Sequence, residues 1–365
     1  MITFNTIKLG EVVTFQRGFD ITKANQTPGE VPIVSSSGIS SLHNKSKSKG
    51  PGVIIGRKGT LGTVHFVKQA YWPHDTTLWV KDFRGNNPRF ISYFLRTLKL
   101  ENFDSGSSNP TLNRNHIHKI KVIFPTNPKT QRKIAAILTA YDDLIATNQR
   151  RIALLEKMAE ELYREWFDRL RFPGYEKAKL VKGVPMGWEV RRLGEILELA
   201  YGKALKSEDR IAGDYDVYGS GGIVGTHNRA LVADGGIVVG RKGNVGAVYL
   251  VDRGFYPIDT VYYVVSDLPD SYLFFLLQRM NFINNDAAVP GLSRSQAYSN
   301  LLFNPELLLI HEFDKFVSPI FRMKSEISSQ NTLLTKSRDL LLPRLISGKL
   351  SVEELKIEFP PSMSE

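Results

Sequence analysis

A nearly identical decapeptide occurs twice in this chain of 365 residues and constrains its fold more than any other feature. The copies read VIIGRKGTLG at residues 53–62 and IVVGRKGNVG at residues 237–246, so Gly240 stands 184 positions after Gly56. At this spacing the neighbouring Leu-Gly-Glu, His-Asn and Asp-Thr stretches also align without a gap. Further along the chain the spacing falls to 180, so the two copies differ in length by an indel of four residues. The chain is therefore a tandem duplication, and two copies of so long a period predict a pair of domains rather than a solenoid.

Each copy has the pattern of a compact mixed domain. Short β-rich runs are separated by Gly, Pro, Ser and Asn, and a short apolar helix follows at residues 89–98 or 271–280. A polar loop then leads to an apolar strand that ends at Pro125 or Pro305. We predict an α+β fold in which each domain has a twisted, mainly antiparallel sheet with small helices.

Two long stretches carry a heptad pattern of apolar residues, which predicts coiled-coil helices. The residues expected to pair the helices are Ile134, Leu138, Tyr141, Ile145, Asn148, Ile152, Leu155, Leu162, Phe316, Ile320, Met323, Ile327, Gln330, Leu334 and Leu341. An antiparallel pairing with pseudo-two-fold symmetry would place the central amides of Asn148 and Gln330 close together. Pro319 is expected to break or kink the second helix, and Pro343 to disturb its last turn.

These patterns give a domain organisation with six segments. The expected order is a first mixed domain at residues 1–130, a long helix at 131–170, a linker at 171–186, a second mixed domain at 187–310, a second long helix at 311–349 and a C-terminal tail at 350–365.

The formal net charge of +11 and the pI near 9.5 favour a polyanionic partner, although a merely basic soluble protein would have the same composition. The absence of cysteine excludes disulfides, thiolate metal sites and cysteine nucleophiles. No apolar run reaches the length of a membrane span, so we expect a cytoplasmic protein with no membrane partner.

The repeated GRKG segment does not fit a phosphate-binding Walker loop. It lacks the hydroxyl residue after a Gly-Lys pair and continues into β-type sequence. Glycines at this spacing instead predict a tight hairpin with positive φ, with Arg57-Lys58 and Arg241-Lys242 at its tip. A solvated basic turn is the alternative.

No catalytic or metal-binding constellation is evident in the sequence. The chain has no methyltransferase tetrapeptide, and Asp75 and Asp259 have no neighbouring ExK motif of a nuclease, so the repeated Asp-Thr pair favours a structural hydrogen bond. His74 is replaced by Ile258 in the second copy, which argues against a metal ligand. We expect no catalytic residue, no metal and no cofactor bound by this chain.

Polar and basic loops of the two copies occupy the same places with different side chains, which is typical of modules that read different sequences. Such groups pair with base edges and phosphates. The repeated His-Asn pair fits either a loop near DNA or a structural turn. The candidate DNA-binding residues are Ser36, Ser37, His43, Asn44, Lys45, Lys47, Lys49, Arg57, Lys58, Asn109, Thr111, Arg114, Tyr218, Ser220, His227, Asn228, Arg229, Arg241, Lys242, Ser293 and Arg294.

The order of these motifs, with the terminal stretch LLLPRLISGKLSVEEL at residues 340–355, resembles the DNA-specificity subunit of type I restriction–modification systems. The resemblance covers essentially the whole chain. It implies a non-catalytic chain with two target-recognition domains, each reading half of a split, asymmetric site in double-stranded DNA. It also implies that the helices dock modification subunits, which bring S-adenosylmethionine, and restriction subunits, which bring ATP and Mg²⁺.

Two alternatives stay open from the residues alone. One is a specificity chain with its own methyltransferase or nuclease activity. The other is a coiled-coil interaction scaffold whose duplicated domains bind protein.

Overall fold

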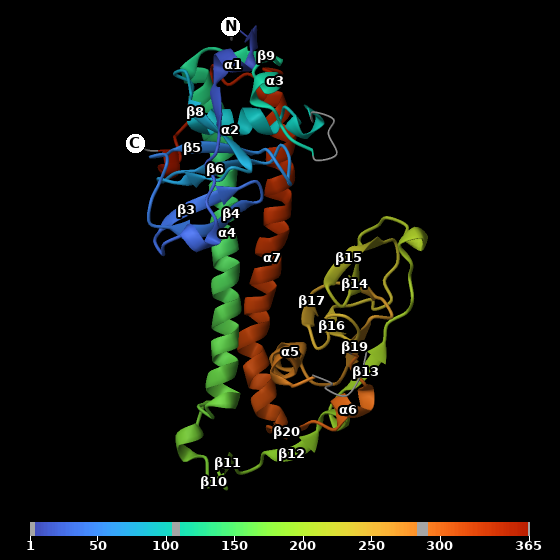
Figure 1. Ribbon diagram of the computed structural model, residues 1–365. Helices are drawn as coiled ribbons and strands as arrows, with labels where there is room; N and C mark the ends of the chain where they lie inside the picture. The colour runs from blue at the N-terminus through green and yellow to red at the C-terminus, as the bar shows by residue number, and fades with distance from the viewer. Residues whose placement is uncertain (1–3, 104–109, 283–290, 364–365) are drawn as a thin grey trace. The chain divides into compact units, whose positions relative to one another are not determined.

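The computed structural model describes residues 4–103, 110–282 and 291–363 (Figure 1). The chain divides into two compact units. Unit 1 consists of Met1–Thr147 and Asn331–Glu365, and unit 2 is Asn148–Gln330. Each unit therefore holds one copy of the repeat together with a part of both long helices.

Unit 1 is built from three small sheets and short helices. Its largest sheet is antiparallel, with the order β2 (Thr14–Arg17), β8 (Thr77–Asp82), β5 (Gly52–Gly56) and β6 (Val64–Val67). The others are β4 (Gly38–His43), β3 (Val31–Ser35) and β7 (Trp72–Pro73), and the antiparallel pair β1 (Phe4–Lys8) and β9 (Lys121–Pro125). The helices are α1 (Leu9–Val12), α2 (Pro88–Arg96) and α3 (Arg114–Ile117).

Unit 2 repeats this topology strand for strand. Its sheets have the orders β13 (Glu198–Tyr201), β19 (Val261–Val265), β16 (Gly236–Gly240), β17 (Val248–Val251); β15 (Gly222–His227), β14 (Tyr215–Gly219), β18 (Phe255–Pro257); and β12 (Glu189–Arg192), β20 (Leu301–Asn304). Its helices are α5 (Asp270–Arg279) and α6 (Arg294–Tyr298), and a small hairpin of β10 (Leu180–Val181) and β11 (Val184–Pro185) precedes the repeat. The predicted α+β class, with two similar mixed domains, is confirmed.

The continuous apolar run of each repeated decapeptide is a strand buried on both faces. In β5, Val53 and Ile55 point into the main core of unit 1, whereas Ile54 packs in a smaller cluster with Tyr71 and Trp79. The same division recurs in β16. Successive side chains of a strand point to opposite faces, so apolar residues at every position indicate cover on both sides.

The two long helices, α4 (Pro128–Tyr163) and α7 (Leu307–Ile346), run antiparallel within each unit. In unit 1, Nη1 of Arg338 in α7 lies 2.7 Å from Oδ1 of Asp142 in α4, and Asn331 Nδ2 donates to the carbonyl oxygen of Ile145 at 3.3 Å. In unit 2, Lys324 lies 2.8 Å from Glu156. Residues later in α4 thus contact residues earlier in α7, which is the predicted antiparallel pairing.

The packed face of α7 differs from the predicted heptad seam at its centre. Ile327 is buried and Gln330 is exposed, and it is Asn331 that reaches across to α4 in unit 1. Phe316 and Met323 are also largely exposed. A straight helix has 3.6 residues per turn, so a strict seven-residue pattern drifts around the helix by about 20° per heptad, and along a helix as long as α7 the contact face passes to a neighbouring residue. On α4 the predicted Ile134, Leu138 and Asn148 are buried.

The prolines of α7 do not interrupt it. The helix is continuous from Leu307 to Ile346, and both Pro319 and Pro343 are exposed. A proline on the solvent side frees a carbonyl that water can satisfy and leaves the packed face intact, which is why the expected break is absent. The helix ends before Gly348, whose φ is +75°. None of the described helices is long and apolar enough to cross a bilayer.

Two side chains at equivalent positions hold the same backbone group in the two units. In unit 1 the backbone N–H of Phe15 donates to Nε2 of His118 at 2.9 Å. In unit 2 the backbone N–H of Leu199 donates to the hydroxyl of Tyr298 at 2.9 Å. Only the histidine can lose this acceptor by protonation, because a proton on Nε2 removes its lone pair.

Acidification is therefore expected to destabilise unit 1 through His118. Burial, with smaller contributions from Arg114 and Arg84, lowers the pKa of this imidazole. Below about pH 6.5 the imidazole of His118 takes up a proton in the unfolded chain but not in the folded chain. The free energy of unfolding therefore decreases as the pH is lowered, until the pKa of the folded state is reached. Losing the hydrogen bond costs about 1 kcal/mol.

The matched variant His118→Tyr copies the arrangement of unit 2 and should lose this component of the pH dependence. Urea midpoints of both chains, measured near pH 7.5 and near pH 5.5, check this. The same decrease in midpoint in both chains would exclude His118 as the source.

Candidate nucleic-acid interface

The GRKG segments form the turns of two equivalent hairpins, β5–β6 and β16–β17. Gly59 and Gly62 have φ of +76° and +72°, and their equivalents Gly243 and Gly246 have +79° and +76°. Side chains are strained in this left-handed region, which explains the glycines. The predicted hairpin with positive φ is confirmed.

The repeated Asp-Thr pair fixes the backbone of each GRKG segment. The N–H groups of Arg57 and Lys58 both donate to the carbonyl oxygen of Thr76, at 2.9 and 3.0 Å. The carbonyl oxygen of Arg57 accepts from Leu112 N at 3.1 Å, and the equivalent three bonds surround Arg241 at 2.8 to 3.1 Å. The structural interpretation of the pair is thereby supported, and three segments that lie far apart in the sequence meet at each loop.

The arginine and the lysine of each loop lie in different environments. Lys58 and Lys242 are exposed, whereas Arg57 and Arg241 are half-buried. The prediction that both side chains stand at the tip thus holds for the lysines, and the arginines lie lower, against neighbouring basic or aromatic side chains.

In unit 1 the half-buried arginine shares a cavity with two further arginines. Arg17, Arg57 and Arg114 line it together with Thr111 and Asn113. Burial lowers the pKa of Arg57, and the charge of Arg17 adds to this effect. Nη1 of Arg57 is buried and has no acceptor among the residues that the structure describes.

In unit 2 the equivalent place holds an aromatic ring. Tyr201 aligns with Arg17, and its ring lies 5.1 Å from the guanidinium carbon of Arg241 and 4.5 Å from that of Arg294. Such stacking fixes the two guanidinium planes. Arg241 Nη1 also donates to the carbonyl oxygen of Asp259 at 2.7 Å.

The sequence did not single out Arg17 or Tyr201. Each is the last residue of its strand and directly precedes an aligned glycine, Gly18 or Gly202, which was the available signal. A Cβ on Gly18 would lie 2.0 Å from the carbonyl oxygen of His74, so that glycine is required by a close backbone approach.

Most predicted DNA-binding residues are accessible. Those that are exposed are Ser37, Asn44, Lys45, Lys47, Lys49, Lys58, Arg114, Asn228, Arg229, Lys242 and Ser293. Those that are half-buried are Arg57, Thr111, Ser220, Arg241 and Arg294. Asn109 lies outside the described residues. Lys47 is held over the rings of Phe19 and Trp72, with its Nζ 5.2 and 4.8 Å from their centroids.

The two predicted histidines belong to the scaffold. His43 is 4% exposed, and its Nδ1 lies 3.0 Å from the backbone nitrogen of Thr27. His227 is 9% exposed, and its Nδ1 accepts from Ile211 N at 3.2 Å. Both rings pack edge-on against an aromatic side chain. Their burial and hydrogen bonds favour the structural-turn interpretation of the His-Asn pair for the histidines.

Two further predicted residues are buried. Tyr218 packs in the smaller apolar cluster of unit 2 with Val238 and Phe255. Ser36 is 8% exposed, and its carbonyl oxygen accepts from Thr63 Oγ1 at 2.6 Å. Successive side chains of a strand and its turn point to opposite faces, and at these two positions the residue points inward. The polar composition of the loops does not reveal which of their residues point inward.

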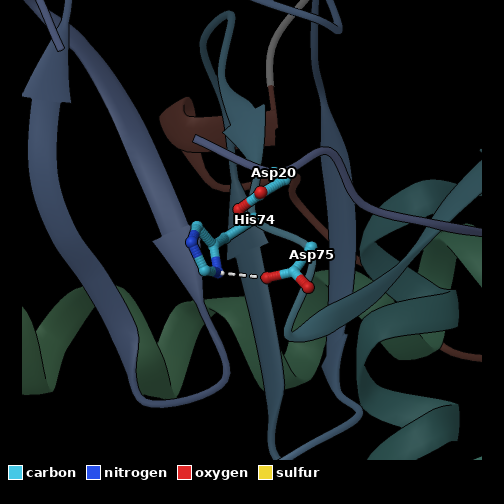
Figure 2. A group of neighbouring side chains, drawn as sticks. All are labelled: Asp20, His74 and Asp75. Carbon is cyan, nitrogen blue, oxygen red and sulfur yellow. Dashed lines mark ion pairs between the residues drawn. The ribbon is translucent and has the colours of Figure 1, made fainter. Parts of the chain in front are cut away.

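Among the described residues, Asp20, His74 and Asp75 have potential metal-ligating atoms within 4.8 Å of one another (Figure 2). Oδ1 of Asp75 lies 3.2 Å from Nδ1 of His74. The other carboxylate oxygen of Asp75, Oδ2, lies 2.9 Å from Nη2 of Arg17. Asp75 thus serves as the counter-charge of a neighbouring cation. Ala204 and Ile258 occupy two of the three equivalent positions in unit 2.

Comparison with known proteins agrees with this arrangement. The family model described as type I restriction modification DNA specificity domain matches residues 1–157 and 185–296. The type I restriction enzyme MjaIX specificity subunit of Methanocaldococcus jannaschii is 27% identical over 296 residues, which cover 70% of this chain and 66% of that protein. The HindI specificity subunit of Haemophilus influenzae is 24% identical over 330 residues, covering 66% of this chain and 71% of that protein.

A solved structure shares the fold. The S subunit of a type I restriction-modification system from M. genitalium superimposes with a TM-score of 0.67 at 18% identity, over 94% of this chain and 96% of that one. The chain spans about two thirds of the length of the curated relatives it matches.

Two similar mixed domains, each with a basic hairpin fixed by the same backbone bonds, define a duplicated two-domain protein. The chain belongs to the type I restriction modification DNA specificity family, and the curated relatives described above are named specificity subunits.

Proposed function

We propose that each unit binds double-stranded DNA with the face that carries its GRKG hairpin, and that each reads one half of a bipartite, asymmetric site. The observation that supports this is that both units have the same sheets and the same hydrogen-bonded hairpin, whereas the side chains of the surrounding loops differ. Phosphate contacts position such a protein, and contacts to base edges specify the sequence. Lys45 and Arg229, which are exposed at equivalent positions of the two copies, supply basic groups in the loop that precedes β5 or β16, and unit 1 has the exposed Lys47 and Lys49 in the same loop.

The proposed domain division follows the repeat. Residues 1–130 and 187–310 would be the recognition domains, 131–170 and 311–349 the spacer helices, 171–186 a linker and 350–365 a tail. We further propose a cytoplasmic complex in which modification and restriction subunits dock on the helices. These subunits would bring S-adenosylmethionine, ATP and Mg²⁺, and this chain would bind none of them.

Exposed apolar side chains on the helices support the docking proposal. Leu154 and Met158 of α4 are 61% and 59% exposed, and Leu333 and Leu340 of α7 are 64% and 62% exposed. Solvated coiled-coil faces carry few large apolar groups, and exposed ones that cluster indicate contact with a partner.

Replacing Arg57 with alanine tests the proposed function. The variant should bind every duplex more weakly, and the slope of log K against log salt should become less negative by about 0.9 for each phosphate that the variant no longer neutralises. The exposed Lys121 on β9 offers a matched control, because Lys121→Ala removes one positive charge away from the hairpin. An unchanged slope for Arg57→Ala would remove this residue from the interface.

The same titration separates DNA binding from the scaffold alternative. A chain that only binds protein would retain no random duplex even at low salt. An assay of the purified chain with labelled S-adenosylmethionine distinguishes a methyltransferase activity of its own.

A further inference from the structure

The most pronounced difference between the two recognition faces lies at one pair of equivalent positions. Arg17 is the last residue of β2 in unit 1, and Tyr201 is the last residue of β13 in unit 2. The arginine of the GRKG segment and the arginine that begins α3 or α6 occur in both units, as Arg57 with Arg114 and as Arg241 with Arg294. These two arginines are thus common to both units, and the third member of the cluster decides how they are used.

In unit 2 the aromatic ring and the surrounding oxygens already satisfy the arginines. The ring of Tyr201 stacks on both guanidinium groups, and Arg294 Nη1 also lies 3.9 Å from Glu198 Oε1. Arg241 Nη1 donates to a backbone carbonyl. Their planes are fixed and part of their charge is balanced within the unit.

In unit 1 three arginines line one cavity, and among the described residues Asp75 is the carboxylate that pairs with one of them. Asp75 Oδ2 lies 2.9 Å from Nη2 of Arg17, whose side chain is 54% exposed. Arg57 has a buried Nη1 without an acceptor among the described residues, and both its burial and Arg17 lower its pKa. A buried cationic donor without a partner costs free energy that an anionic acceptor would recover.

We propose that Arg17, Arg57 and Arg114 form a pocket for one phosphate group of the DNA backbone, and that Tyr201 replaces this contact in unit 2 by fixing the arginines through stacking. The proposal rests on the proposed DNA binding and adds to it that the two units contact DNA by different means. Unit 1 would carry one more strongly electrostatic contact than unit 2.

The chemistry of the cluster favours a phosphate over a base. A guanine offers two neutral acceptors and is read by the fork of one arginine. Three converging cations with one counter-charge match anionic oxygens, for which guanidinium is the preferred partner. A pocket that binds a phosphate contributes affinity for every sequence, and a pocket that reads guanine contributes affinity for one base.

Exchanging the two residues in the full-length chain tests the proposal. Arg17→Tyr should bind all duplexes of a random pool more weakly, with a salt slope less negative by about 0.9, and Tyr201→Arg should make the slope more negative by a similar amount. Arg17→Lys retains the charge without the fork and should keep the slope of the wild type. Thermal unfolding of each variant verifies that both units remain folded.

Two results would overturn the proposal while the proposed function stands. The first is wild-type binding with a normal salt slope that Arg17→Tyr leaves unchanged. The second is an Arg17→Lys chain that keeps its slope but loses the preference for one base pair in selected duplexes, which would make Arg17 a base-reading residue. A wild-type chain that binds no duplex would instead contradict DNA binding itself.

Discussion

Removing residues 351–365 is expected to destabilise unit 1 by about 4 kcal/mol and to leave unit 2 unaffected. Val352 has no exposed surface and lies in the core cluster of unit 1 with Leu345 and Ile346. Burial of a valine side chain contributes about 2 kcal/mol, and the hydrogen bonds of a charged group contribute a similar amount.

Those hydrogen bonds come from one lysine of α4. Lys133 Nζ donates to the carbonyl oxygens of Val352, Glu353 and Leu355, at 3.2, 2.6 and 2.9 Å. Arg132 lies over the ring of Phe359, with the guanidinium carbon 4.4 Å from the centroid. The C-terminal segment therefore packs against the core of the first unit.

Tryptophan fluorescence during urea unfolding resolves the two units. Trp72 and Trp79 report on unit 1, and Trp166 and Trp188 on unit 2. The truncation should lower the midpoint of the first pair alone. Leu355→Ala, at a side chain that is 48% exposed, is the matched control and should shift neither midpoint. An unaltered midpoint for unit 1 in the truncated chain would show that the segment does not contribute to its core.

Features that depend on sequence periodicity and on duplication could be predicted. The aligned glycines gave the two hairpins, the β-rich runs gave the strands, and the two heptad stretches gave α4 and α7. In each case the pattern lies within a few neighbouring residues, where steric limits on the backbone and burial of one face determine the structure.

Features that depend on contacts between distant segments could not be predicted. The cavity of unit 1 joins Arg17, Arg57 and Arg114 from three parts of the chain, and only the folded sheet brings them together. His43 and Tyr218 are polar residues in or beside turns, yet their rings point into the scaffold. The seam residue of α7 moved from Gln330 to Asn331 because helix geometry drifts against a seven-residue pattern.

Selection of duplexes from a random pool by the purified chain is expected to enrich one split motif. Each recognition domain should specify one block of base pairs, and selected duplexes should bind about 10³-fold or more tightly than random DNA at physiological salt. Loss of contacts to base edges costs about 1 to 3 kcal/mol per position, so variants of one unit should relax one block.

Ser293 and Asn113 provide the matched variants. Both are exposed and lie next to the arginine that begins α6 or α3 in its own unit. The selection should be repeated with Ser293→Ala and with Asn113→Ala, and the enriched sequences compared position by position.

That comparison tests directly whether the duplicated units read separate halves of one site. We expect two conserved blocks separated by a stretch of unconserved positions, with each variant relaxing a different block. A single uninterrupted block, or variants of the two units that relax the same positions, would contradict it.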